Sequence, residues 1–155
     1  GMIQSKENNE FFSIGCLGKI TNFTESQDGR YQINLEGLNR FKINRVVKND
    51  YKFVTVDGEH LNYNSNFKKQ TNSLGQELFS NFKKYLTVKD IKFNTAEFEK
   101  LDALNLARII CVISPFDYLT KQMLLEFNNS DDFCENLISV LEIEIKNVGA
   151  NTKIN

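Results

Sequence analysis

The sequence has no tryptophan, one proline and one histidine in 155 residues, and its three cysteines lie far apart. With Pro115 as its single proline, the chain contains no Pro-rich tail or rigid Pro-rich linker. Cys16, Cys111 and Cys134 form no CxxC pair, so neither a disulfide framework nor a zinc ribbon is indicated. We interpret the three cysteines as reduced core thiols of a cytoplasmic protein.

Charge of one sign and long apolar runs are also scarce. Nineteen basic residues face 20 acidic ones, and the net charge of −1 disfavours a dedicated binder of nucleic acid or anionic membranes. The longest apolar run, Ile109–Ile113, is far shorter than the ~20 residues that span a bilayer. The polar N-terminus lacks the apolar region of a signal peptide, so we expect a soluble, cytoplasmic protein.

The motifs of the common nucleotide-binding and hydrolytic enzymes are missing. There is no GxxxxGK[ST] phosphate loop and no GxGxxG, which excludes P-loop and Rossmann sites of the usual form. His60 falls in the stretch Asp57-Gly58-Glu59-His60, interpreted as a polar turn, without an elbow serine nearby. One histidine and three scattered cysteines make no transition-metal site. We therefore predict no catalytic residue, no cofactor and no metal.

The first 63 residues have the period of strands. Tyr31, Ile33 and Leu35 alternate with polar residues, which predicts a strand with one buried face. Asp28-Gly29 is a tight-turn signal before it, and Gly37 is expected to interrupt it. The pattern predicts a small antiparallel sheet or partial barrel with strands at Phe11–Ile20, Tyr31–Leu35, Phe41–Ile43 and Tyr51–Val56, the last closed by Asp57-Gly58.

The second half has helical spacing. Apolar residues recur at three and four from Phe67 to Leu86, and a second helix is expected from a capping-box-like Asn94 to Ile113, with Val112 and Ile113 buried. Asp117 can cap a third helix, which Asn128-Asn129-Ser130 breaks. A fourth helix is expected from Asp131 to Gly149. The predicted organisation is α+β, with a β subdomain at 1–63, a helical subdomain at 64–148 and a tail at 149–155.

Two groups of side chains in the first helix allow a functional interpretation as well as a structural one. Lys68-Lys69 and Lys83-Lys84 fit a basic RNA-binding face, but a solvated outer face explains them more simply. The aromatic set Phe79, Phe82 and Tyr85 fits a ligand cage, but core packing explains it more simply.

Several short segments in a fixed order resemble the N-terminal domain of the ATP-dependent protease Lon. They are Ile14-Gly15-Cys16-Leu17-Gly18-Lys19-Ile20, Asp28-Gly29-Arg30-Tyr31, Leu35-Glu36-Gly37-Leu38-Asn39-Arg40-Phe41-Lys42-Ile43, Leu106-Ala107-Arg108-Ile109, Ser114-Pro115-Phe116 and Lys121-Gln122-Met123-Leu124-Leu125-Glu126. The similarity covers about residues 1–146. It implies a PUA-like β-barrel subdomain followed by a helical bundle, in a region that helps recognise protein substrates and contributes to assembly. It also implies a stand-alone bacterial form without ATPase or peptidase.

The family opens with about fifty residues of apolar strands, a turn and a helix that have no counterpart here. The resemblance therefore implies a truncated barrel with an open sheet edge and uncovered apolar side chains. Such an edge predicts a homodimer in which the open edges of two copies pair.

Three hypotheses about function follow. The first is a non-catalytic protein-interaction module that binds polypeptide segments or partner proteins, with Phe11, Phe12 and Phe23 as candidate contacts, although Phe11 and Phe12 also fit a core role. The second is an RNA-binding PUA-like domain. It needs a basic row, for which the candidates are Lys19, Arg30, Arg40 and Lys42, and the net charge argues against it. An enzyme with an unrecognised site is the third, and no residue pattern supports it.

Overall fold

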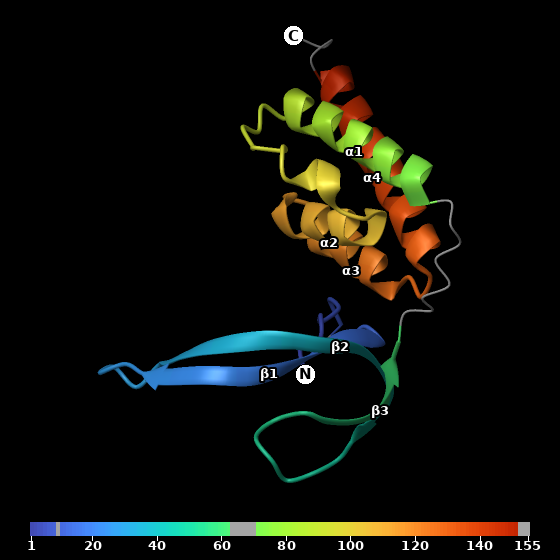
Figure 1. The fold of residues 1–155 in the computed structure, drawn as a ribbon. Helices are drawn as coiled ribbons and strands as arrows, with labels where there is room; N and C mark the ends of the chain where they lie inside the picture. Colours follow the sequence, from blue (N-terminus) through green and yellow to red (C-terminus); the bar gives the residue numbers. More distant parts are fainter. Residues whose placement is uncertain (9, 63–70, 152–155) are drawn as a thin grey trace. The chain divides into compact units, whose positions relative to one another are not determined.

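A strand-rich unit and a helical unit follow one another along the chain (Figure 1). The computed structural model describes residues 1–8, 10–62 and 71–151, and contacts divide the chain into the units Gly1–Asn62 and Tyr63–Asn155. An antiparallel sheet occupies the first unit and helices occupy the second, so the predicted α+β class is confirmed.

The first unit contains a three-stranded sheet. Its strands β1 (Ile14–Glu25), β2 (Tyr31–Val47) and β3 (Thr55–Leu61) lie in the order β1-β2-β3, each antiparallel to its neighbour. The turn between β1 and β2 uses Gly29 with φ of 78°, a conformation that side chains rarely adopt. Beside it, Ser26 Oγ donates to the backbone oxygen of Arg30 at 2.9 Å, which closes the hairpin predicted from Asp28-Gly29.

Three of the strand predictions are wrong in their limits. The first strand was expected at Phe11–Ile20, whereas β1 begins at Ile14 and continues to Glu25. β2 is continuous through Gly37, and the irregularity beside this glycine is a one-residue bulge at Leu38 that does not end the strand. The last strand begins at Thr55, and Asp57-Gly58 lies inside it instead of closing it. The reason is a close approach: a Cβ on residue 58 would collide with the backbone oxygen of Lys42, so glycine serves the pairing of β2 with β3.

Two bulges set which side chains share a face in the hairpin of β1 and β2. Leu38 is an extra residue in β2, and it shifts the pairing with β1 by one position. Thr21 is an extra residue in β1, and it shifts the pairing back. Within β2, residues 31, 33 and 35 share one face by alternation. Their partners in β1 lie on that face too: Ile20 is opposite Leu35, Phe23 is opposite Ile33, and Glu25 is opposite Tyr31. The bulge at Thr21 is what brings Ile20 and Phe23, three positions apart, to the same face.

We call residues 18–37 the arm, and the set Ile20, Phe23, Tyr31, Ile33 and Leu35 the apolar arm face. The other face of the arm carries the cross-strand pairs Lys19–Glu36, Asn22–Asn34 and Thr24–Gln32, all polar. The predicted alternation is thus confirmed, but the prediction that its apolar face is buried is wrong: these five side chains are 44–66% exposed.

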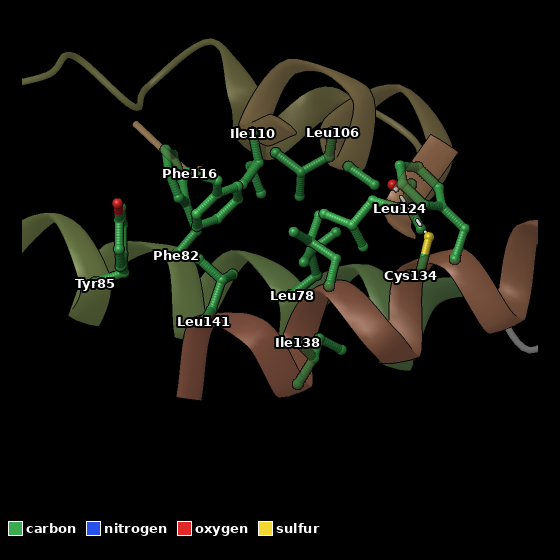
Figure 2. Close-up of a cluster of buried hydrophobic side chains, with 14 of the residues drawn as sticks. Leu78, Phe82, Tyr85, Leu106, Ile110, Phe116, Leu124, Cys134, Ile138 and Leu141 are labelled. Carbon is green, nitrogen blue, oxygen red and sulfur yellow. Dashed lines mark hydrogen bonds between the residues drawn. The ribbon is translucent and has the colours of Figure 1, made fainter. Parts of the chain in front are cut away.

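The second unit is a bundle of helices around one apolar core. It comprises α1 (Thr71–Val88), a short 3₁₀ turn η1 (Phe98–Lys100), α2 (Ala103–Ile113), α3 (Tyr118–Glu126) and α4 (Ser130–Asn151). Figure 2 shows side chains of α1, α2 and α4 meeting in the interior, with Phe116 and Leu124 beside them. Fully buried members of this core are Leu78, Phe82, Tyr85, Leu106, Ile110, Leu124, Cys134, Leu137 and Leu141. Phe82 and Tyr85 are therefore core residues, whereas Lys83 and Lys84 are exposed; Lys68 and Lys69 lie outside the described residues.

Helix starts follow local hydrogen bonds. Asp117 caps α3 as predicted, with its side chain accepting from Thr120 N at 2.9 Å. The predicted start of α2 at Asn94 is wrong, because Asp102 is the residue that caps it, accepting from Asn105 N at 2.9 Å. Asn94 instead closes a local turn by accepting from Ala96 N at 3.1 Å.

Two further expectations about the helices are corrected. Val112 is 78% exposed and Ile113 is 36% exposed, because the apolar run 109–113 is longer than the face of α2 that meets the core. The last helix continues past Gly149 to Asn151. A glycine near a helix end costs only about 1 kcal/mol relative to alanine, which does not by itself stop a helix.

Candidate functional site

An apolar hollow of about 480 Å³ lies on the sheet of the first unit. The ladder pairs Phe41 with His60 and Ile43 with Gly58, so these positions share one face. His60 thus lies in β3 and not in the turn that the sequence predicted. Eight of the twelve lining residues are large and apolar: Ile3, Phe11, Leu17, Phe41, Ile43, Phe53, Val54 and Val56; the others are Gly1, Gly58, Glu59 and His60.

The N-terminal segment forms one wall of this hollow. Met2 and Cys16 exchange two backbone hydrogen bonds of 2.7 and 2.9 Å, which fix the segment along the base of β1. Phe12 N donates to Gln4 O at 3.0 Å, and Ser5 bridges Phe11, so the segment turns back on itself. This return places both Ile3 and Phe11 on the lining.

The loop between β2 and β3 supplies another part of the lining through Phe53 and Val54. Asn49 Oδ1 accepts from Tyr51 N at 2.9 Å, which holds the start of the loop. The Tyr51 and Phe53 rings stack with centroids 5.0 Å apart and planes 6° apart. Phe53 is still 66% exposed, so an aromatic ring is available to a ligand at this point.

The three phenylalanines named from the sequence are in different places. Phe11 lines the hollow. Phe12 is outside its lining, with Lys6 Nζ 5.3 Å from the ring centroid. Phe23 belongs to the apolar arm face, where its centroid is 6.4 Å from that of Tyr31. Sequence reasoning missed Phe41, Phe53 and Val56 as lining residues, because only the ladder and the loop bring them next to Phe11.

The four basic residues of the RNA-binding alternative do not form one exposed row. Arg40 and Lys42 share a face, as alternation predicts, but Arg40 is only 5% exposed. Lys19 points to the other face and pairs across the ladder with Glu36. Arg30 Nε donates to Asp28 Oδ2 at 2.7 Å in the hairpin turn, and this bond holds the pKa of Asp28 down at about 2.

The cysteines are free thiols in environments that disfavour the thiolate. Cys134 is buried, and Cys16 and Cys111 are half-buried. Burial raises the pKa of Cys111 and of Cys134 to about 12, and raises that of Cys16 above its usual value. Cys134 Sγ donates to Ala103 O at 3.6 Å. None of the three has the lowered pKa of a nucleophilic cysteine.

A second hollow, of about 490 Å³, lies within the helical unit between Phe79, Phe98, Leu101 and Leu106. Its lining is more polar than that of the sheet hollow: it includes Gln76 and two carboxylates, Glu99 and Asp102, of which Asp102 already caps α2. Over the described ranges, no three His, Cys, Asp or Glu side chains are grouped in a way that could hold a metal ion. No helix of that same part of the chain has the length and apolar character to cross a bilayer.

The family match and the relatives found by sequence comparison all concern Lon proteins. Residues 2–142 match the family of the ATP-dependent protease La (LON) substrate-binding domain. Lon protease of Buchnera aphidicola subsp. Baizongia pistaciae is 26% identical over 151 residues, which are 92% of this chain and 19% of that protein. Lon protease of Escherichia coli K12 is 24% identical over 141 residues, 88% of this chain and 18% of the enzyme. The chain therefore spans less than a fifth of the length of these relatives.

Solved structures show the same fold at low identity. The Lon N-terminal domain protein from Xanthomonas campestris superposes with a TM-score of 0.60 at 16% identity, over 83% of this chain and 68% of that one. The N-terminal domain of Lon protease from the Mycobacterium avium complex gives 0.61 at 16% identity, over 88% and 74%. With residues 2–142 matched, the chain belongs to the LON substrate-binding domain family.

Proposed function

We propose that this chain is a non-catalytic module that binds extended segments of other polypeptides through the sheet hollow. The observation that carries the proposal is the hollow itself: an apolar depression with aromatic rings from the N-terminal segment, a strand and a loop. The family is named for substrate binding, and the relatives are proteases whose substrates are polypeptides. The matched region is the substrate-binding domain, which supports binding without catalysis.

The chemistry of the lining indicates which segments would bind. Phe11, Phe41 and Phe53 offer flat apolar surface, and only Glu59 and His60 carry ionisable side chains. Such a lining favours an aromatic or branched aliphatic side chain, buried away from water, over a charged one. A volume of about 480 Å³ admits one or two such side chains, which gives broad selectivity for apolar sequence and little for its details.

Binding measurements with a permanently unfolded polypeptide, reduced and alkylated so that it cannot refold, test the proposal. We expect Phe53→Ser to weaken binding roughly tenfold, because the ring is a 66% exposed part of the lining whose loss removes contact area. Leu38→Ser is the matched control: Leu38 is 61% exposed in the same unit and lies outside the hollow. Equal affinities of the wild type and Phe53→Ser would contradict the proposed site, and no binding to any unfolded polypeptide would contradict the function.

The sequence-based candidates Phe11, Phe12 and Phe23 are ranked by the same assay. Phe11→Ser should weaken binding, because Phe11 lines the hollow, whereas Phe12→Ser and Phe23→Ser should leave it within about twofold. A cytoplasmic location is part of this proposal, supported by three cysteines that are free thiols.

A further inference from the structure

We infer that the apolar arm face is a contact surface for a second copy of this chain, with two arms packed face to face about a two-fold axis. The five residues of this face are Ile20, Phe23, Tyr31, Ile33 and Leu35, exposed by 56, 66, 61, 47 and 44%. None of the five is charged, and the one charged side chain that the ladder places on the same face of the hairpin is Glu25, opposite Tyr31 at the turn end. This surface is separate from the hollow, because none of the five lines it.

In an amphipathic hairpin such as the arm, the apolar face is normally covered by another part of a protein. All cross-strand pairs on its other face are polar, so one side of the hairpin is made for water and the other is not. A two-stranded hairpin alone is marginally stable in water, and three or more strands or a packing partner are needed to support it. Apolar patches beyond a few hundred Å² are uncommon on monomers, and this face exposes on the order of 600 Å².

The shape of the face favours a second copy as its occupant. Its bulky end carries the rings of Phe23 and Tyr31, next to the hairpin turn. Its other end has the glycine pair Gly18–Gly37, where a Cβ on residue 37 would meet no atom within 4 Å. When two arms pack antiparallel, the rings of each copy lie over the glycines of the other, and the aliphatic side chains meet in between.

The area agrees with this assignment. A stable protein interface buries about 800 Å² per partner, and the arm face with its glycine end provides most of that. Pairing of open sheet edges, the dimer that the sequence predicted, would join two sheets into a wider one; at the β1 edge it would leave the apolar face uncovered. Packing of two arms face to face removes the apolar arm face from water, and this burial stabilises the dimer more than edge pairing, which leaves the face exposed.

Sedimentation equilibrium at micromolar concentration, on the full chain, tests the inference. The wild type should be a dimer. Ile33→Lys should raise the dissociation constant roughly 100-fold, because it buries an unpaired charge in the contact. The matched control, Gln32→Lys, adds the same charge one residue away on the polar face and should remain dimeric.

A second variant separates specific packing from general stickiness. Gly37→Leu makes the face more apolar but fills the space that receives the partner's rings, so we expect dissociation to increase about tenfold. Stronger association of this variant would overturn the inference. So would a monomeric wild type, or a dimer that neither Ile33→Lys nor Gly37→Leu affects, which would indicate pairing elsewhere, such as at the β1 edge.

Melting curves followed by circular dichroism establish that each variant is folded. Should Ile33→Lys unfold, Phe23→Ser replaces it, because Phe23 lies near the hairpin turn and is 66% exposed. Loss of the dimer with unchanged affinity for unfolded polypeptide distinguishes this contact from the proposed function, since the two surfaces share no residue.

Discussion

Lys89 Nζ lies 2.7 Å from Glu144 Oε2, a contact that ties the residue after α1 to α4. Both side chains are about 30% exposed, at 29 and 33%, and Lys89 Nζ is also 5.9 Å from the centroid of the Tyr85 ring. Partial burial reduces screening by solvent, while the desolvation of both groups offsets part of the attraction.

Breaking this ion pair should destabilise the helical unit slightly. We expect Glu144→Gln and Lys89→Met each to lower the free energy of unfolding by about 0.5 kcal/mol. A double-mutant cycle in thermal melts isolates the pair, since the double variant should lose less than the sum of the single losses. Additive losses at low salt would show that the two side chains do not interact.

Two neighbouring positions in α2 should respond very differently to the same truncation. Ile110 is fully buried in the helical core, whereas Val112 is 78% exposed on the same helix. Ile110→Ala should cost about 2–5 kcal/mol, because it leaves a cavity that the core fills only in part. Val112→Ala should stay within about 0.5 kcal/mol of the wild type. Denaturant unfolding followed by helical circular dichroism measures both, and similar losses would mean that the position of α2 on the core is wrong.

Stability at acidic pH should depend on the cap of α2. The backbone hydrogen bond from Asn105 is the main reason that the pKa of Asp102 is lowered from its ordinary value of 3.8. The folded state therefore binds the proton more weakly than the unfolded state, so this contribution is present above about pH 4 and is lost as the pH falls through the folded pKa.

Asp102→Asn keeps a capping oxygen but cannot titrate. The melting temperature of this variant should fall less between pH 6 and pH 3 than that of the wild type. The difference should be about 2–4 °C, if the ionised cap contributes ~0.5 kcal/mol to the free energy of unfolding. Asp102→Ala removes the cap and should lower stability by about 1 kcal/mol at neutral pH. Parallel pH profiles of the wild type and Asp102→Asn would contradict the assignment.

Alkylation of the cysteines should report opening of the helical core. Cys134 is fully buried, and burial raises its pKa to about 12, so little thiolate is available for reaction. We expect iodoacetamide to modify Cys134 only at the rate at which the core opens, and more slowly than half-buried Cys16. Peptide mass spectrometry resolves the two sites. Modification of Cys134 as fast as in denaturant would contradict its placement.

Patterns among neighbouring residues predicted most of the strands and helices of this fold. The errors occurred where the structure depends on contacts between residues far apart in the sequence. Alternation at Tyr31, Ile33 and Leu35 and the cap at Asp117 were read correctly, because each depends on neighbouring residues. β3 was misplaced because Gly58 is required by the approach of β2, which no local pattern records. The exposure of Val112 depends on which side of α2 meets the core.

Of the residues that line the sheet hollow, the sequence analysis names only Phe11 as a candidate contact. Phe11 could be named from an aromatic cluster near the N-terminus, but its partners Phe41 and Phe53 are 30 and 42 positions away along the chain. The sequence pattern places Phe41 only in an alternating strand, and it predicts a strand at Phe53 where the structure has a loop. Spatial grouping of this kind follows from strand register, which the bulges shift by one residue.

The bulge at Thr21 has a consequence for how the chain tolerates changes in length. In an uninterrupted strand, Ile20 and Phe23 would project to opposite sides, since they are three positions apart. A deletion of Thr21 would therefore keep every apolar side chain where it is and merely regularise the ladder, whereas a one-residue insertion between Asn22 and Phe23 would rotate the end of the strand by half a turn. Length variation among natural relatives is thus expected to be accepted at this position of β1 and rejected two residues later.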